Sequence, residues 1–267
     1  MALLVCVVSR ARGRGKTVLI ERLTERFASE RFKVVTVKHI SGSFDTSKKD
    51  TWRHLEAGAA LTVASTPNEI VTITRTSNPP LEETLDTIYT KPQLILVEGY
   101  KRSPYPKILC AETAEEAAVA LEEITNIIMV TGRISSRVED KKSLQRKFPE
   151  SPVYDFDGVV SALKAMLVDS VLKELPGLDC KHCGYDSCRE LAKAIIGGEA
   201  TIEDCEVLTT EIATLKVDGT KVPLGNFPQQ IIRSVVLGII DTLKGIRRSP
   251  RHIEITVSAE DDKESSA

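Results

Sequence analysis

The sequence has no large excess of charge, no long apolar run and few cysteines, and each absence excludes a class of protein. Its 36 basic and 38 acidic residues give a net charge of -2, which points to neither nucleic acid nor membrane as a partner. The apolar runs fall far short of the roughly 20 residues that span a bilayer. The apolar stretch within residues 1–10 is too short for a signal peptide. We therefore expect a soluble cytoplasmic protein.

Cysteine is too sparse to build a disulfide scaffold, with six residues in 267. Four of the six lie between positions 180 and 205, a clustering that favours a metal or iron–sulfur site in a cytosolic chain. The other two, Cys6 and Cys110, lie in apolar runs, and we interpret them as small buried hydrophobes. The length of the chain suggests one large domain or two smaller ones.

The first 165 residues alternate between β-rich runs and amphipathic stretches. Strands are predicted over 3–8, 33–39, 61–65, 69–75, 93–99, 107–111 and 126–130. Helices are predicted over 16–30, 49–59, 80–89, 113–123 and 157–174. Continuous apolar strands that alternate with helices indicate an α/β fold with a mostly parallel sheet and helices on both faces. Gly15-Lys16-Thr17, which follows the first strand and opens the first helix, indicates the P-loop NTPase type of this fold.

The remaining third of the chain has a different pattern, which predicts two small modules after the nucleotide-binding domain of residues 1–165. Residues 166–209 hold the four clustered cysteines and a short helix near 187–198. Residues 210–258 predict a ββαβ unit, with a type I′ turn at Asp218-Gly219, a helix over 226–246 that Asn226 caps, and a strand over 252–258. Residues 259–267 form a polar acidic tail that we expect to be disordered.

The stretch "SRARGRGKT", residues 9–17, predicts a phosphate-binding loop between the first strand and the first helix. Gly13 and Gly15 allow backbone N–H groups to turn toward a phosphate at the N-terminus of the helix. Lys16 is expected to reach the β- and γ-phosphates, and the Thr17 hydroxyl is expected to bind Mg²⁺. The alternative is a solvated basic turn before a helix.

Arginines distinguish this loop from the usual motif. Arg10 occupies the position where G-x-x-x-x-G-K-[ST] has its first glycine. With Arg12 and Arg14 it adds positive potential that we expect to face the phosphates of a ligand. Two acids follow strands at the same sheet edge: Asp45, which offers a ligand for Mg²⁺ or water, and Glu98, which is expected to orient an attacking water. Each acid taken alone is equally well read as a polar residue at a strand end.

Four segments in order, "GKTVLIERL", "VKH", "KKDTWRHLEAGA" and "LILVEGYK…PKI", resemble the molybdopterin-guanine dinucleotide biosynthesis protein B (MobB) family over about residues 2–165. The resemblance implies a dimeric GTP-binding protein with weak GTPase activity. Such a protein assists a partner enzyme, a guanylyltransferase, that attaches GMP to molybdopterin. The carry-over places phosphate and Mg²⁺ contacts on Gly13, Gly15, Lys16 and Thr17, and further contacts on Asp45, Asp50 and Glu98.

Arg10 departs from the pattern of that family, as does Lys48, which stands where glycine often precedes "KD". No N-K-x-D guanine motif is visible. The residues "VTGR", 130–133, follow the strand where such a motif would stand. A preference for GTP over ATP is therefore implied by the resemblance alone.

The clustered cysteines, Cys180, Cys183, Cys188 and Cys205, have the spacing C-x2-C-x4-C-x16-C. Four thiolates suit a [4Fe–4S] cluster or Zn²⁺, and the x4 interval departs from the paired C-x-x-C of zinc ribbons. His182 could replace one ligand in a zinc site. The stretch resembles the small four-cysteine iron–sulfur domain of some anaerobic corrinoid and electron-transfer proteins, which implies [4Fe–4S]. Structural, redox and docking roles for the cluster are all open.

Three functions fit these patterns. The first is a GTP-binding accessory protein in the maturation of a molybdenum or tungsten cofactor, with an added iron–sulfur module. The second is an iron–sulfur scaffold that docks a molybdenum or tungsten enzyme and carries a degenerate P-loop. The third is a small-metabolite kinase, which ranks last because no lid or acceptor motif is evident.

Overall fold

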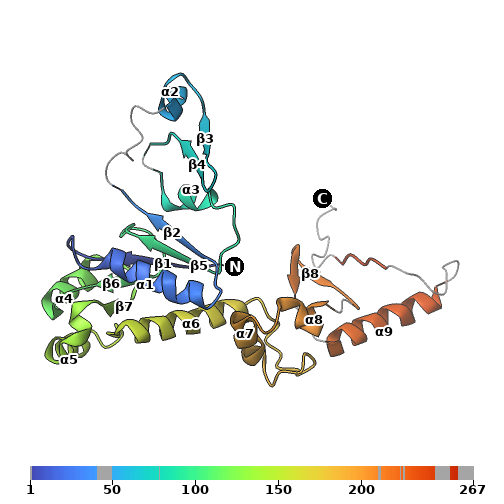
Figure 1. Cartoon of the computed structure of the whole chain (residues 1–267). Helices are drawn as coiled ribbons and strands as arrows, with labels where there is room; N and C mark the ends of the chain where they lie inside the picture. Colours follow the sequence, from blue (N-terminus) through green and yellow to red (C-terminus); the bar gives the residue numbers. More distant parts are fainter. Residues whose placement is uncertain are drawn as a thin grey trace, which may run out of the picture. The chain divides into compact units, whose positions relative to one another are not determined.

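The computed structural model describes residues 2–40, 50–77, 79–209, 212–222, 224, 226–243 and 253–257 (Figure 1). Contacts divide the chain into two compact units, residues 1–171 and residues 172–267. Among the described residues, no helix has the length and apolar character needed to cross a membrane.

The first unit is built on a five-stranded parallel sheet with the order β2-β5-β1-β6-β7 (Figure 1). Its strands are β1 (Leu3–Val8), β2 (Val34–Lys38), β5 (Leu94–Glu98), β6 (Lys107–Cys110) and β7 (Ile127–Thr131). β1 lies in the middle of the sheet and pairs with β5 on one side and β6 on the other. The loop after β1 therefore lies between the loops that follow β5 and β6, at the edge where open α/β sheets bind ligands.

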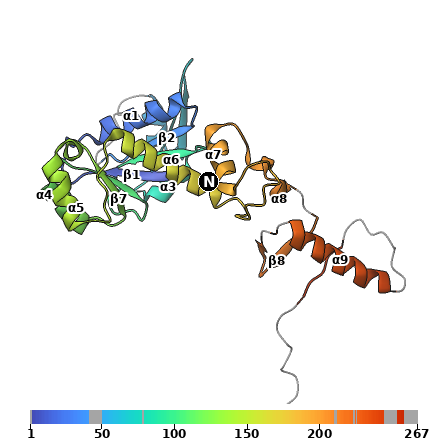
Figure 2. The same cartoon turned by 90° about the horizontal axis from the view of Figure 1, so that it is seen from below.

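Helices cover both faces of this sheet, as the apolar pattern predicts. They are α1 (Lys16–Ser29), α3 (Leu81–Asp86), α4 (Ala114–Glu123), α5 (Val138–Lys147) and α6 (Phe156–Leu172). α1 and α6 lie side by side on one face (Figure 2), where Lys164 pairs with Glu30 at 2.6 Å and Arg22 lies over the Phe156 ring. On the other face, apolar residues of α3, α4 and α5 join alternate residues of the strands in one core. The predicted α/β fold is confirmed.

Two predicted strands form a ribbon of their own rather than joining the main sheet. β3 (Leu61–Ser65) and β4 (Ile70–Thr74) pair only with each other, in antiparallel register. We call this ribbon the β3–β4 arm. The short helix α2 (Asp50–Glu56) precedes the arm and lies against β3. Apolar side chains of the arm, such as Leu61 at 52% and Ile70 at 72%, are exposed among the described residues.

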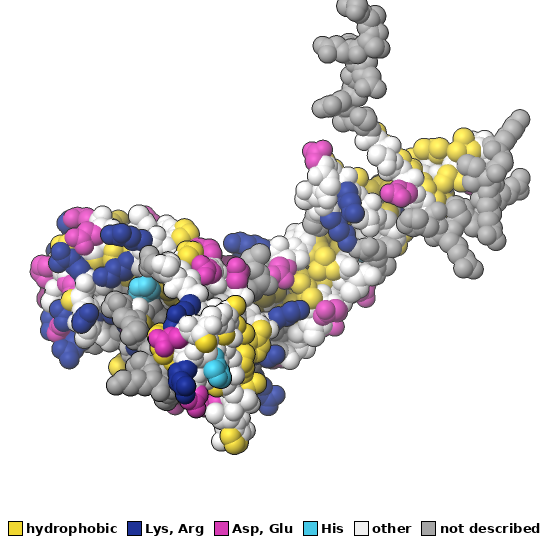
Figure 3. Space-filling model, turned by 90° about the horizontal axis from the view of Figure 1, so that it is seen from above, with side chains coloured by type: hydrophobic (Ala, Val, Ile, Leu, Met, Phe, Trp, Pro, Cys, Tyr) yellow, Lys and Arg dark blue, Asp and Glu magenta, His cyan; other side chains and the backbone are white. Residues whose placement is uncertain are grey.

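The second unit begins with the cysteine segment and ends with a hairpin and a helix. Its elements are α7 (Cys188–Gly197), the 3₁₀ turn η2 (Ile202–Asp204), α8 (Glu206–Thr209), β8 (Leu215–Val217), β9 (Thr220–Val222) and α9 (Asn226–Thr242). Asp218 and Gly219 both have positive φ, 49° and 77°, which is the backbone of the predicted type I′ turn. Hydrophobic side chains gather over α9 (Figure 3), including Phe227, Val235 and Ile239, which are each more than half exposed.

The last predicted strand does not form. Its described part, residues 253–257, has no strand structure, and both strands of the β8–β9 hairpin pair only with each other. Ile255 and Val257 are exposed, at 56% and 82%. A strand requires a partner for its backbone groups, and the described residues offer none at this point. As far as the described residues go, the unit is a hairpin plus a helix rather than ββαβ, and the expected tail over 259–267 lies outside them.

Candidate functional site

The loop after β1 has the backbone geometry of a phosphate-binding turn. Gly13 and Gly15 lie in the left-handed region, with φ of 73° and 80°, and Gly15 caps α1 directly before Lys16. A Cβ at either glycine would have no atom within 4 Å, so glycine is required by the backbone angle and not by space. The first turn of α1 holds no acidic residue. Its N–H groups can therefore face an anion.

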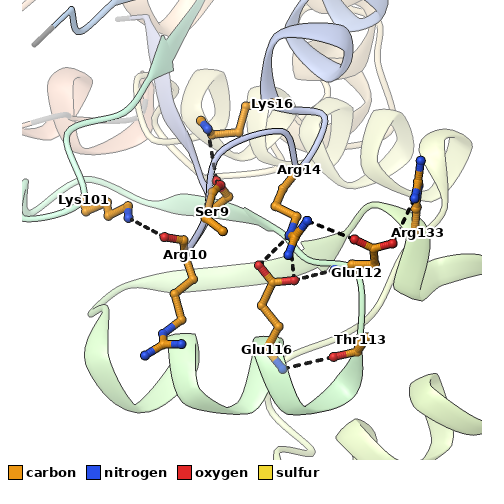
Figure 4. A network of polar contacts seen from close by, with 10 residues as sticks. Ser9, Arg10, Arg14, Lys16, Lys101, Glu112, Thr113, Glu116 and Arg133 are labelled. Carbon is orange, nitrogen blue, oxygen red and sulfur yellow. Dashed lines mark hydrogen bonds and ion pairs between the residues drawn. The ribbon is translucent and has the colours of Figure 1, made fainter.

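Lys16 folds back over this loop. Its Nζ donates to the Ser9 hydroxyl at 3.0 Å, and that hydroxyl donates to the Ala11 carbonyl at 2.6 Å (Figure 4). Ser9 is buried directly after β1, so its hydroxyl holds the Lys16 side chain against the loop.

Thr17 and Glu98 meet across the sheet edge. The Thr17 hydroxyl donates to the two Glu98 carboxylate oxygens, at 3.1 and 3.0 Å, and Lys38 Nζ lies 3.5 Å from the same carboxylate. Neighbouring oxygen ligands of an octahedral Mg²⁺ lie about 3 Å apart, because each bond is about 2.1 Å long. The hydroxyl and the carboxylate thus have the separation of two adjacent magnesium ligands.

Arg10 and Arg14 are paired with glutamates of the neighbouring segment, and Figure 4 shows the partners of Arg14. Arg10 lies 3.3 Å from the Glu123 carboxylate, and both side chains are about half exposed. Arg14 contacts Glu116 at 2.9 Å and Glu112 at 3.0 Å. Both guanidinium groups are therefore engaged by carboxylates, whereas Arg12 is simply exposed. The loop thus forms with Arg10 at the position of the missing first glycine, and the Arg10 side chain points to Glu123 of α4.

The two predicted aspartates lie elsewhere. Asp45 falls outside the described residues. Asp50 is the first residue of α2, and its carboxylate lies 3.6 Å from Arg53 of the same helix, with its side chain 91% exposed. Figure 1 draws α2 well away from the start of α1. Within the described residues, the predicted set that meets at one place is Lys16, Thr17 and Glu98.

The four clustered cysteines line one pocket of the second unit. Around Cys180, Cys183, Cys188 and Cys205 the pocket is lined by Pro176, Leu178, Lys181, Ser187, Leu191, Glu206 and Val207. Cys188 and Cys205 are buried, Cys183 is half-buried and Cys180 is exposed. Four thiols around one largely apolar pocket are the donor set of a [4Fe–4S] cluster, and Zn²⁺ also accepts four thiolates. Among the described residues, no three His, Cys, Asp or Glu side chains form a group that could hold a metal ion, so the ligand set rests on the shared pocket and the sequence spacing.

The segment around these cysteines is fixed by its own caps. Ser187 caps α7 by accepting from Glu190 N, and the Asp179 carboxylate accepts from Cys188 N at 2.7 Å. Burial raises the pKa of the Cys205 thiol, and hydrogen bonds from the backbone N–H groups of Leu208 and Val207 act in the opposite direction and lower it. These N–H groups are placed to stabilise a thiolate.

Sequence comparisons identify relatives for both units. The model of a family described as "Molybdopterin guanine dinucleotide synthesis protein B" matches residues 4–132. A Methanocaldococcus jannaschii protein named "Putative molybdopterin-guanine dinucleotide biosynthesis adapter protein" is 30% identical over 246 residues, which cover 91% of this chain and 92% of that protein. The chain belongs to the MobB family.

Other proteins are similar to parts of the chain. The molybdopterin-guanine dinucleotide biosynthesis adapter protein of Haemophilus influenzae is 32% identical over 123 residues, covering 44% of this chain and 67% of that protein. A crystal structure of Bacillus subtilis MobB covers 66% of this chain and 98% of its own, with 23% identity and a TM-score of 0.46. A second family model, described as "Putative Fe-S cluster", matches residues 175–207, the cysteine segment of this MobB family member.

Two buried groups lie near the site, Lys107, which the sequence did not single out, and Cys110. Lys107 is fully buried at the start of β6, and its Nζ donates to the carbonyls of Ser103 and Tyr105 at 2.6 and 3.0 Å. Lys107 thereby fixes the segment after Glu98. The sequence signal that could have identified this lysine is its place in the "PKI" segment. Burial raises the pKa of Cys110 to about 12, with Lys16 acting in the opposite sense, so this thiol stays neutral beside the loop. Cys110 and Cys6 are buried as predicted.

Proposed function

We propose that this MobB family member is a GTP-binding adapter in the synthesis of molybdopterin guanine dinucleotide. The observation that carries the proposal is the meeting of Lys16, Thr17 and Glu98 at one sheet edge, directly after two left-handed glycines. A strand–loop–helix with this backbone suits the phosphates of a nucleoside triphosphate. The adapter role in molybdopterin-guanine dinucleotide synthesis is stated in the names of its relatives.

In this proposal each side chain has a distinct task. Lys16 exchanges its bond to Ser9 for the β- and γ-phosphates, which it neutralises. Thr17 and Glu98 hold Mg²⁺, the ion that would neutralise developing charge on the phosphates. Glu98 orients water, directly or through the ion, and supports at most a weak GTPase activity.

GTP binding by the purified protein tests the nucleotide site. We expect the unaltered protein to bind GTP in the presence of Mg²⁺ and Lys16→Ala to lose most of that affinity. Lys91→Ala, which removes an exposed lysine outside the site, is the matched control. Equal binding by the unaltered protein and Lys16→Ala would refute the nucleotide site, and competition with ATP measures the base preference.

We also propose a homodimer that assists a guanylyltransferase acting on molybdopterin. The exposed apolar residues of the β3–β4 arm support a second copy, because a two-stranded ribbon is marginal without a covering layer. Light scattering of Ile70→Glu against the unaltered protein checks this. An unchanged mass above that of the monomer would exclude the arm as the interface.

The cysteine pocket is proposed to hold a [4Fe–4S] cluster, on the shared lining and the match to an iron–sulfur family. Anaerobic purification with metal analysis should give about four irons and four sulfides per chain. Stoichiometric zinc would refute the cluster.

A second candidate is an iron–sulfur docking protein for a molybdenum or tungsten enzyme, whose P-loop no longer binds nucleotide. Arg10 at the first glycine position, ion-paired to Glu123, favours it. Normal partner binding by Lys16→Ala, combined with loss on Cys183→Ser, would support this candidate over the first.

A further inference from the structure

Arg14 joins the P-loop to the segment that follows β6 (Figure 4). Its Nε lies 2.9 and 3.0 Å from the two Glu116 carboxylate oxygens, and its terminal nitrogen lies 3.0 Å from Glu112. A guanidinium that uses two kinds of N–H group on two carboxylates is held in position and in orientation.

The two glutamates are themselves fixed by α4 and its cap. Glu116 accepts from the backbone N–H of Glu112 at 3.1 Å, and its own N–H donates to the Thr113 hydroxyl at 3.3 Å. Glu112 also accepts from Arg133, which follows β7, at 2.9 Å. The side chains of Glu116 and Glu112 are only 14% and 25% exposed. Arg14 therefore meets a rigid acceptor that is shielded from water.

Arg14 stands between the two left-handed glycines, Gly13 and Gly15. Glycine occupies left-handed and right-handed backbone at similar cost, so both flanking residues can rotate and turn the N–H groups away from a phosphate. The side chain of Arg14 is the sole attachment available between them. We propose that Arg14 is a positioning residue, which holds the N–H groups of the loop in their phosphate-binding orientation through Glu112 and Glu116 and does not contact the phosphate. The inference rests on the proposed nucleotide site.

The neighbouring pair of Arg10 and Glu123 provides an internal comparison. It also joins the loop to α4, but its shortest distance is 3.3 Å and both side chains are half exposed. Such surface pairs contribute little. Glu123→Gln is thus a matched control for Glu116→Gln: the same helix, the same chemical change, and a partner in the same loop.

The effect of Glu116→Gln on the affinity for GTP distinguishes a positioning role of Arg14 from direct contact of Arg14 with phosphate. If Arg14 acts through Glu116, Arg14→Gln and Glu116→Gln each weaken binding at least about tenfold, and the double variant is no weaker than either. If Arg14 contacts phosphate, removal of its competitor Glu116 leaves affinity unchanged or raises it, and the proposal is wrong. Glu123→Gln is expected to bind within about twofold of the unaltered protein.

A second readout needs no nucleotide. Hydrogen exchange of the Leu19 amide, which donates to the Gly15 carbonyl at 2.9 Å, should be at least about tenfold faster in Arg14→Gln and Glu116→Gln, and unchanged in Glu123→Gln. Urea unfolding of the same variants identifies global destabilisation, which would accelerate exchange throughout the sheet. Exchange as slow as in the unaltered protein overturns the proposal. If the unaltered protein binds neither GTP nor ATP, the proposed function fails, and the exchange experiment still decides the role of Arg14.

Discussion

Gly132 sits where the end of β7 approaches the end of β6, and alanine there should destabilise the first unit strongly. Its backbone has φ 100° and ψ -156°, a region that only glycine adopts readily. A Cβ would lie 2.7 Å from the carbonyl oxygen of Ala111 and 3.2 Å from its nitrogen. Both are backbone atoms of the segment that carries Glu112, so neither can turn aside as a side chain could.

Two costs add for Gly132→Ala. The backbone conformation costs about 1–3 kcal/mol, and forced overlap in a packed region costs about 1–3 kcal/mol more. The total of about 2–6 kcal/mol is a large share of the 5–15 kcal/mol that stabilises a typical domain. Gly58 is the control, because its φ of 103° is nearly the same and a Cβ there would meet nothing within 4 Å. Gly58→Ala should show the cost of a similar positive φ without the close approach.

Urea unfolding followed by circular dichroism measures both variants. We expect Gly132→Ala to lower the free energy of unfolding by about 1–3 kcal/mol more than Gly58→Ala, at an unchanged m-value. Equal losses in the two variants would refute the argument from close approach, since the backbone angle would then explain the whole effect.

Three further predictions concern the cysteine segment and the Arg14 network. Cys183→Ser should reduce bound iron from about four per chain to near zero. Asp179→Ala removes the acceptor 2.7 Å from Cys188 N, and this lost cap should lower the stability of the segment by about 1 kcal/mol. Iron should then be released faster to a chelator, whereas Asp179→Asn keeps the acceptor and should release iron as slowly as the unaltered protein. Arg133 and then Arg14 lower the pKa of Glu112, so its ion pairs stabilise the fold above its ordinary value of 4.5 and are lost as pH falls through the lower folded value. Exchange of the Leu19 amide, corrected for intrinsic rates, should rise in that acid range, and Glu112→Gln should show a smaller rise, because Glu116 also binds Arg14.

Apolar pattern was sufficient to predict the main sheet, because strands such as β1 and β5 are buried on both faces and read as continuous apolar runs. It was not sufficient for α5. That helix, "VEDKKSLQRK", is polar along most of its length and buries Leu144 alone, so it has too few apolar positions to show a period. Pairing of β3 with β4 alone was equally invisible, since alternation indicates a strand and not its partner.

Part of the candidate site could also be predicted from the sequence. The positive φ of Gly13 and Gly15 and the placement of Lys16 and Thr17 at the start of α1 follow from a local motif, whose spacing fixes its geometry. The partners of Arg14 do not, because Glu116 lies 102 residues further along the chain. The T-x-x-E sequence beginning at Thr113 is a readable capping signal, but it gives no hint that its glutamate also binds an arginine from another loop.

The central place of β1 has a consequence for synthesis of the protein. β1 leaves the ribosome before the other strands of its sheet, yet its two neighbours are β5, which begins at Leu94, and β6, which ends at Cys110. At 5–20 residues per second, about 5–20 s pass before both exist. For that time the nascent chain carries an apolar strand with two open edges, so the first strand of this sheet depends longest on chaperones or on the ribosome surface.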